Sequence, residues 1–134
     1  MANALYPLWK EQLLQFTTDN NLSAGNVKVA LIDTSLYSYN VAHQYWTSAS
    51  AASVGTPQTI GSKTFTGGPF DGADVTFTAV TGLPVEALII WIDTGTPGDS
   101  PLVAYIDTSV TGLPVTPNGG NITITWNASG IFTL

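Results

Sequence analysis

The sequence predicts a mainly β fold, an antiparallel β-sandwich or flattened barrel with an N-terminal α-helix and one short additional helix. Apolar residues make up 44% of the 134 residues and charged residues only 9%, so the chain can bury the core of one domain. Threonine is abundant, and 13 glycines and 8 prolines divide the chain into short segments. We therefore expect a single domain over residues 1–134, with a helix near residues 5–16 and a β region over residues 27–134.

The helix is predicted over Leu5–Phe16, near the N-terminus. Leu5, Trp9, Leu13 and Phe16 recur at helical spacing, so their apolar side chains share one face. This stripe can pack on the sheet of its own domain, or it can dock onto a neighbouring subunit.

The clearest strands are predicted at Val27–Asp33, Glu86–Asp93 and Leu102–Asp107. Glu86–Asp93 is apolar almost throughout, which indicates the central strand of a sheet. Leu102–Asp107 is expected to pair with it across Thr94–Pro101, a segment dense in turn residues. Further strands are expected at Thr59–Thr66, Asp74–Val80, Asn121–Trp126 and Ile131–Leu134, with a turn over Gly67–Gly72.

Two segments between the first strands are less regular. Val41, Tyr45 and Trp46 would share one face of a helix, so the additional short helix is predicted over Ser38–Trp46. Thr47–Pro57 consists of small and polar residues, and we expect it to form a mobile surface loop that can serve as a contact arm.

Two short sequences recur along the chain. VTGLPV occurs at residues 80–85 and 110–115, and Ile-Asp-Thr ends three predicted strands, at residues 32–34, 92–94 and 106–108. Their spacing is too irregular for a repeat architecture. We interpret them as turn sequences, because an aspartate side chain can accept hydrogen bonds from the backbone that follows it.

The charge of the chain restricts its partners. The net charge is −6, and the three basic residues Lys10, Lys28 and Lys63 are scattered. Nucleic-acid binding needs clustered cations, and anionic membranes repel an acidic protein, so we expect neither as a partner. The longest apolar run, Ala87–Ile92, is too short to span a bilayer.

The sequence offers few groups for catalysis or cofactor binding. There is no cysteine, His43 is the sole histidine, and no G-x-S-x-G motif is present. Asp71 and Asp74 flank a Gly-Ala step that indicates a turn, although a Ca²⁺ site, or a hydrolase that also uses Glu86, are alternatives. We expect no enzymatic activity, no catalytic residues, no metal and no cofactor.

Tryptophan side chains raise a second alternative. Trp46 and Trp126 lie near polar segments and could stack on sugar rings, as in a carbohydrate-binding module used for host attachment. Trp9 and Trp91 instead fit buried stripes, the usual place of aromatic residues. Exposed coplanar rings beside a groove would favour this alternative, and buried rings would oppose it.

The order of several segments carries a family resemblance. These segments are LYPLWKEQLL, VKVALIDTSLYSYNVAHQYW, IGSKTFTGGPFDGADVTFTAV, EALIIWIDTGT, LVAYIDT and GLPVTPNGGNITITW. Over nearly the whole chain, the sequence resembles a family of small virion-associated proteins of tailed bacteriophages. The resemblance implies a structural role in the virion and supplies no catalytic residues.

Within that class, a capsid decoration or cement protein agrees best with an acidic, β-rich chain without cysteine. Such a protein is made in the cytoplasm of the host bacterium and binds the outer surface of the head. Its partners would be the major capsid protein or other virion proteins and further copies of itself, with a trimer as one arrangement; a tail or neck component is the alternative. We expect these interface residues, because large apolar and aromatic side chains dominate binding energies: Leu5, Trp9, Leu13, Tyr37, Tyr39, Tyr45 and Trp46.

Overall fold

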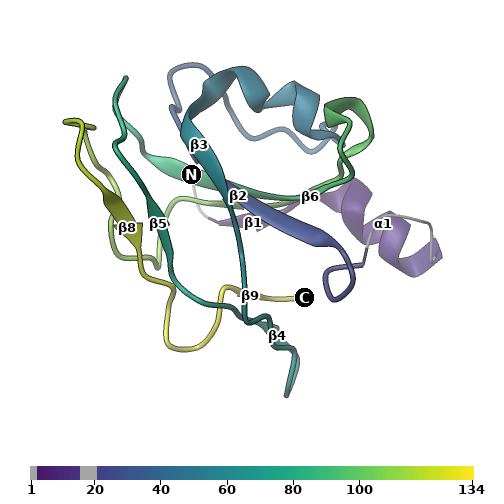
Figure 1. Cartoon of the computed structure of the whole chain (residues 1–134). Helices are drawn as coiled ribbons and strands as arrows, with labels where there is room; N and C mark the ends of the chain where they lie inside the picture. Colours follow the sequence, from purple (N-terminus) through teal and green to yellow (C-terminus); the bar gives the residue numbers. More distant parts are fainter. Residues whose placement is uncertain (1–2, 16–20) are drawn as a thin grey trace.

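The structure is a computed structural model that describes residues 3–15 and 21–134, and it confirms the mainly β fold (Figure 1). A five-stranded antiparallel sheet has the order β1-β7-β6-β2-β3, and two smaller sheets pair β4 with β9 and β5 with β8. In the described residues the sheets form a sandwich-like arrangement and no closed barrel. The elements are β1 (Ala4–Leu5), α1 (Pro7–Gln15), β2 (Asn26–Ile32), β3 (Ser53–Thr59), β4 (Pro69–Phe70), β5 (Val75–Phe77), β6 (Ala87–Asp93), β7 (Leu102–Ile106), β8 (Ile122–Ile124) and β9 (Phe132–Thr133).

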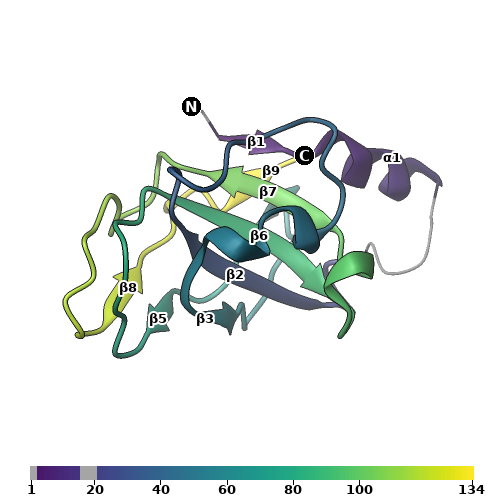
Figure 2. The same ribbon diagram turned by 90° about the horizontal axis from the view of Figure 1, so that it is seen from above.

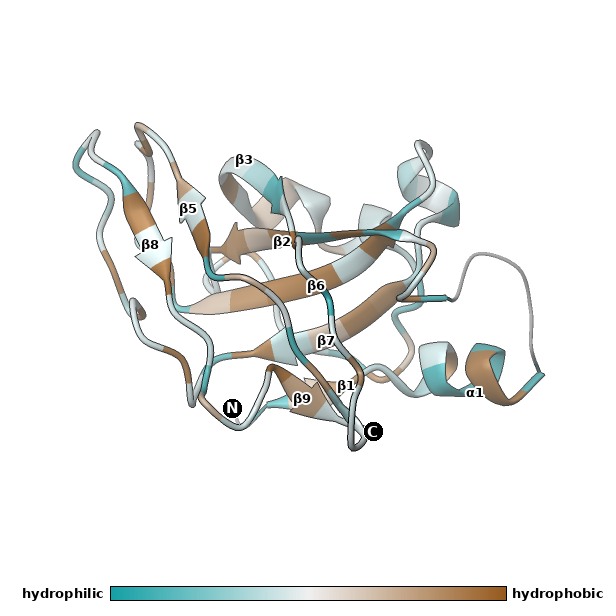
Figure 3. Cartoon of the chain, turned by 60° about the horizontal axis from the view of Figure 1, so that its bottom comes forward, coloured by the Kyte–Doolittle hydropathy of each residue, from teal (hydrophilic) through white to brown (hydrophobic). Residues whose placement is uncertain are grey.

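Strand β6 lies at the centre of the large sheet, as its apolar sequence predicts. It pairs with β2 on one side and with β7 on the other, so that Ile90 lies opposite both Val29 and Ala104. Its first six residues are buried, and β7 is buried throughout. Figure 3 shows both strands brown, hence apolar, over most of their length. A strand can be apolar on both faces only where both faces of the sheet are covered.

Two different layers cover the large sheet, which Figure 2 shows from above with β7, β6 and β2 side by side. One face carries an irregular segment that includes two 3₁₀ turns, Trp46–Ser48 and Ser50–Ala52. The other face carries the small sheets, whose residues Phe77 and Ile124 are fully buried. The alternating burial of β5 and β8 confirms the strands predicted within Asp74–Val80 and Asn121–Trp126, although both are shorter than predicted.

The N-terminal helix begins later than predicted. Leu5 belongs to strand β1 and lies opposite Ala104 of β7, and the backbone N–H of Tyr6 donates to the carbonyl of Val103 at 3.0 Å. The helix begins at Pro7, because the ring of proline fixes a backbone angle suited to the first helical turn and needs no N–H partner there. Phe16, the predicted last residue, lies outside the described residues.

The helix predicted over Ser38–Trp46 is wrong. The backbone of this segment has no helical ladder, and its end bonds to the chain around the start of β7: the N–H of Trp46 donates to the carbonyl of Ser100 at 2.8 Å. The N–H of Leu102 in turn donates to the carbonyl of Gln44 at 2.9 Å. The helical spacing of Val41, Tyr45 and Trp46 therefore does not reflect one helix face: Trp46 stacks on Trp91 of the sheet, whereas Val41 is exposed.

The surface loop predicted over Thr47–Pro57 is also wrong. The segment forms the two 3₁₀ turns and most of β3, and Ala49, Ala52 and Val54 are buried. Small side chains let this backbone lie close to the sheet. The next prediction, a strand over Thr59–Thr66, holds for its first residue alone.

The chain leaves the large sheet after Thr59. Thr64 then pairs with Asp71 through two backbone hydrogen bonds of 3.0 Å. The predicted turn over Gly67–Gly72 consequently contains a strand, β4, which pairs with β9 near the C-terminus. Residues 64–71 therefore form a glycine-rich hairpin, although the sequence of this segment is typical of a simple turn.

The recurring sequences do serve turns. The side chain of Asp33 accepts a hydrogen bond from the backbone N–H of Ser35 at 2.9 Å, and that of Asp93 accepts one from Gly95 at 2.8 Å. The last residues of the two VTGLPV copies, Val85 and Val115, exchange two backbone hydrogen bonds of 2.8 and 2.9 Å. The two copies therefore meet in space at their ends.

Candidate interaction surface

Four tyrosines and the single histidine form a cluster on the face covered by the irregular segment. We call Tyr6, Tyr37, Tyr39, Tyr105 and His43 the tyrosine cluster. The hydroxyls of Tyr6 and Tyr37 lie 2.7 Å apart, and the Tyr37 hydroxyl is 3.0 Å from Nδ1 of His43. The ring of Tyr39 contacts those of Tyr6 and Tyr105, with centroids 5.0 and 5.8 Å apart. The cluster joins the N-terminal segment to β7 and to the chain after β2.

The hydroxyls of this cluster act as neutral hydrogen-bonding groups. Burial raises the pKa of Tyr6, and the hydrogen bond with Tyr37 raises it further. Burial also raises the pKa values of Tyr37, Tyr39 and Tyr105. A tyrosine whose pKa lies above its ordinary value near 10 keeps its proton at neutral pH, so these groups contribute shape and hydrogen bonds without charge.

The cluster also closes one edge of the large sheet. Strand β1 is only two residues long, and the outward carbonyl of Leu5 accepts a hydrogen bond from the hydroxyl of Tyr39 at 3.0 Å. The side-chain oxygen of Asn3 accepts hydrogen bonds from the backbone N–H groups of Asp107 and Thr108 at 2.7 and 2.9 Å. Short strands and occupied edge groups disfavour the addition of a foreign strand.

The opposite edge of the large sheet, β3, contacts a residue that follows β5. Gly55 in β3 adopts a positive φ of 72°, and a side chain there would lie 3.3 Å from Cγ1 of Val80. Val80, which follows β5, therefore lies against Gly55 of this strand. The β1 edge is engaged by side chains of the chain itself, whereas Gly55, Thr56 and Thr59 of β3 are exposed.

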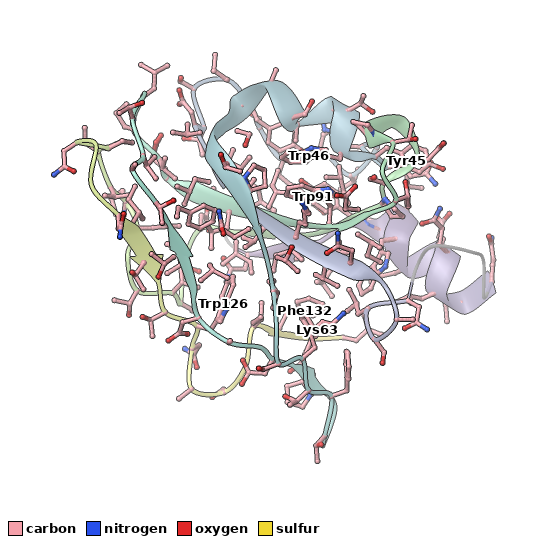
Figure 4. All side chains as sticks on the ribbon, in the orientation of Figure 1. Tyr45, Trp46, Lys63, Trp91, Trp126 and Phe132 are labelled. Carbon is pink, nitrogen blue, oxygen red and sulfur yellow. The ribbon has the colours of Figure 1, made fainter. Side chains whose placement is uncertain are left out.

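Three of the seven predicted interface residues lie inside the molecule. Trp9 packs edge-on against Phe132, with ring centroids 5.9 Å apart, as expected for a helix that packs on its own domain. Tyr37 belongs to the tyrosine cluster, and Trp46 stacks on Trp91 with centroids 3.8 Å apart and planes only 5° from parallel (Figure 4). The other four, Leu5, Leu13, Tyr39 and Tyr45, are half-buried.

Two aliphatic residues that sequence reasoning did not select are exposed beside these rings. Leu36 and Val41 have 61% and 59% of their surface accessible to solvent, and they bracket the buried or half-buried Tyr37 and Tyr39. We call residues 36–43 the aliphatic loop. One sequence signal could have identified this loop: the large apolar residues Leu36 and Val41 occur among residues typical of turns. Other exposed apolar side chains among the described residues are Leu14, Phe65, Leu83 and Leu134.

Hydrogen bonds support the aliphatic loop. The side chain of Asp33, just before the loop, accepts from both the backbone N–H and the hydroxyl of Ser35 at 2.9 and 2.7 Å. Within the loop, the side chain of Asn40 accepts from the N–H of Ala42 at 2.8 Å, and its carbonyl accepts from the N–H of His43 at 3.0 Å. Tyr37 and Tyr39, which belong to the loop, contact Tyr6 and Leu5 of the N-terminal segment. Leu36 and Val41 are therefore exposed on a turn that the tyrosine cluster supports.

The tryptophans proposed for sugar binding have no free ring face. Trp46 is 7% exposed and is covered by Trp91. Trp126 is also 7% exposed, and its indole N–H donates to the carbonyl of Ala73 at 2.9 Å. A sugar ring stacks on an exposed aromatic face, so the burial of both rings opposes the carbohydrate-binding alternative.

The carboxylates proposed for catalysis or metal binding accept hydrogen bonds from structural groups, two of them from the backbone and one from a threonine hydroxyl. Asp71 accepts a hydrogen bond from the N–H of Gly72 at 2.9 Å, and Asp74 accepts one from the N–H of Trp126 at 3.0 Å. Glu86 accepts from the hydroxyl of Thr34 at 3.2 Å. Within residues 3–15 and 21–134, no group of three or more histidine, aspartate or glutamate side chains is arranged to hold a metal ion.

Comparisons with models of known protein families and with characterised proteins found no match for this sequence. The family resemblance therefore rests on the sequence segments given above. Among the residues that the structure describes, no helix is both long and apolar enough to cross a membrane.

Proposed function

We propose that this protein is a non-enzymatic structural component of a tailed-bacteriophage virion, a decoration or cement protein that binds the outer surface of the head. The observation that carries the proposal is the aliphatic loop, which exposes Leu36 and Val41 on a turn supported by the tyrosine cluster. The resemblance to virion-associated proteins supports the class of protein, and the loop supplies a surface with which it can bind.

The aliphatic loop has the physical properties of a binding surface. A turn that is already ordered loses little conformational entropy when it binds, so more of the energy of apolar burial contributes to affinity. Each contact is small, but a cement protein binds in many copies and can contact several capsid subunits at once, which strengthens attachment. The partner would be the major capsid protein, and trimers at threefold positions would suit such an arrangement.

The charge of the protein agrees with a position outside the packaged DNA. Its net charge is −6, and two of its three lysines are engaged within the chain. Nζ of Lys28 lies 3.5 Å from Oδ2 of Asp93, and Nζ of Lys63 donates to two backbone carbonyls at 2.7 Å. An acidic surface with so few free cations is unsuited to bind nucleic acid and is compatible with an outward position.

Binding to undecorated heads tests the proposal directly. Heads of the encoding phage that lack the protein are mixed with wild-type protein and with the double variant Leu36→Asp/Val41→Asp, and bound protein is measured by co-sedimentation. We expect the double variant to bind at least about tenfold more weakly, because apolar residues at the centre of an interface contribute more than 1 kcal/mol each. The matched control is Leu83→Asp, at an exposed leucine outside the aliphatic loop.

Cryo-electron microscopy of the mixture then locates the bound protein. A regular array on the capsid lattice is the expected result. A ring confined to the neck or tail would move the protein to the alternative role, and failure of the wild-type protein to bind any virion part would contradict the proposal. Equal loss of binding in Leu83→Asp would show that the aliphatic loop is not the contact surface.

A further inference from the structure

An asparagine followed by two glycines forms an exposed turn between residues 118 and 120. Asparagine followed by glycine is the dipeptide most prone to spontaneous deamidation, because glycine has no Cβ to hinder the approach of its backbone nitrogen to the preceding side chain. Asn118 is exposed, and Gly119 has a φ of 87°, so the turn depends on the flexible residue that also promotes the reaction.

The reaction needs no reactant other than water. The backbone nitrogen of Gly119 loses its proton and attacks Cγ of Asn118, a C–N bond forms, and the side-chain nitrogen leaves as ammonia. One water molecule then opens the cyclic imide at either carbonyl, which yields aspartate or isoaspartate. No group is oxidised or reduced, and the chain gains one negative charge.

In the fold, the backbone nitrogen of Gly119 and the side chain of Asn118 are both engaged in other hydrogen bonds. The N–H of Gly119 donates to the carbonyl of Val80 at 2.7 Å, and the side-chain oxygen of Asn118 accepts from the N–H of Gly120 at 2.9 Å. The carbonyl of Gly120 accepts from the N–H of Val80 at 3.0 Å, and Val80 is buried. The nucleophile is thus engaged with a backbone carbonyl, and the side chain is fixed in its turn.

We propose that Asn118 is a latent deamidation site, which the pairing of Val80 with residues 119–120 keeps unmodified in the folded protein. Modification then requires local opening of this pairing, so its rate follows the fraction of molecules in the open state. Isoaspartate lengthens the backbone by one methylene, so the original hydrogen bonds cannot re-form in register. The change is irreversible, so modified molecules accumulate with the time that this end of the β5–β8 pair spends open.

Peptide mapping by mass spectrometry tests the proposal. The full-length protein is incubated in mildly alkaline buffer, folded in one sample and unfolded in urea in the other, and aspartate and isoaspartate at position 118 are measured over time. We expect deamidation at Asn118 to be at least about tenfold slower in the folded protein, which corresponds to an opening free energy of about 1.4 kcal/mol. Asn127, which is exposed and followed by alanine, is the internal control and should change slowly in both samples.

Two variants make the test sharper. The variant Asn121→Ala removes the hydrogen bond from the N–H of Ala79 to the Asn121 side chain, 3.1 Å long, and should accelerate deamidation in the folded protein alone. The variant Gly119→Ala should slow the reaction in urea, because a Cβ then hinders the attack. Equal rates at Asn118 in the folded and unfolded wild-type samples would overturn the proposal, as would a stable Asn118 in the unfolded chain.

Discussion

The two faces of the large sheet are covered by different means. On one face, Tyr6, Tyr37 and Trp46 come from segments with little regular structure: the hydroxyls of Tyr6 and Tyr37 contact each other, and the ring of Trp46 stacks on Trp91 of β6. On the other, Phe77 and Ile124 come from short paired strands that bury every second side chain. In Figure 4, Trp46 and Trp91 lie on the first side, and Trp126 and Phe132 on the second.

This difference shows that an irregular segment can cover a sheet as completely as regular strands do. Such a segment must bring backbone and hydroxyl groups into the interior, and each buried polar group needs a partner. The tyrosine cluster pairs its own hydroxyls with one another and with His43, and one of these hydroxyls also engages the β1 edge, while backbone groups of the segment bond to Ser100 and Leu102. The face covered by the small sheets meets the same requirement through strand pairing. The predictions below test whether the two faces differ in this way.

Loss of a large buried ring should destabilise both faces strongly. We expect Trp91→Ala and Phe77→Ala each to lower the free energy of unfolding by about 3–5 kcal/mol, because each leaves a cavity in a packed core. Urea unfolding followed by circular dichroism measures the change, and Leu14→Ala, at an exposed helix position, is the control. A small effect of Trp91→Ala alone would show that the irregular layer adapts and is less well packed than the strands.

The pH dependence of stability should distinguish the tyrosine face. The pKa of Tyr6 is raised in the folded protein above its unfolded value near 10. Below that value Tyr6 is neutral in both states, and its contribution is complete. Above it the unfolded chain releases the proton while the folded protein keeps it, so stability falls by about 1.4 kcal/mol per pH unit for each such tyrosine.

Urea unfolding at several alkaline pH values measures this slope. The variant Tyr6→Phe should be less stable at neutral pH, because the Tyr37 hydroxyl loses one partner, but its stability should fall less steeply above pH ~10. An unchanged slope in this variant would mean that Tyr6 does not contribute to alkaline unfolding.

Removal of the half-buried cationic contact of Lys63 should have a moderate effect on the face covered by the small sheets. Nζ of Lys63 donates to the carbonyls of Leu22 and Gly25, which belong to the turn before β2. We expect Lys63→Met to cost about 1–3 kcal/mol, because both carbonyls lose a charge-assisted hydrogen bond. Lys10→Met, at an exposed helix position, should change stability by less than about 0.5 kcal/mol, and a similar loss in both variants would refute the assignment.

The smallest effect is expected on the solvent side of the short strands. The hydroxyls of Thr76 and Thr123 lie 3.1 Å apart across the β5–β8 pair, and both side chains are exposed. We expect Thr76→Val to change the free energy of unfolding by no more than about 0.5 kcal/mol, because water replaces the lost hydroxyl contact. A larger loss, seen by urea unfolding, would show that these strands depend on polar contacts as the irregular layer does.

The regular part of the fold could be predicted from the sequence. The apolar run of Glu86–Asp93, the breakers of Thr94–Pro101 and the alternation of Asn121–Trp126 are local patterns, and the structure confirms the strands and the pairing that they predict. Local patterns suffice there because the pattern of apolar residues along a strand itself indicates which of its faces are buried.

The irregular layer could not be predicted in this way. Ser38–Trp46 has helical spacing, yet its backbone bonds to Ser100 and Leu102, which are more than 50 residues away along the chain. The same applies to the predicted interface residues, since Trp46 is buried only because the fold brings Trp91 against it.

The sequence by itself therefore determined the class of fold, the central strands and the scarcity of reactive groups. Only the tertiary structure decided which aromatic rings are internal, which strand edges are closed and which apolar residues, Leu36 and Val41, remain exposed. The physical reason is that exposure depends on what other segments of the chain cover, and a local pattern carries no information about those segments.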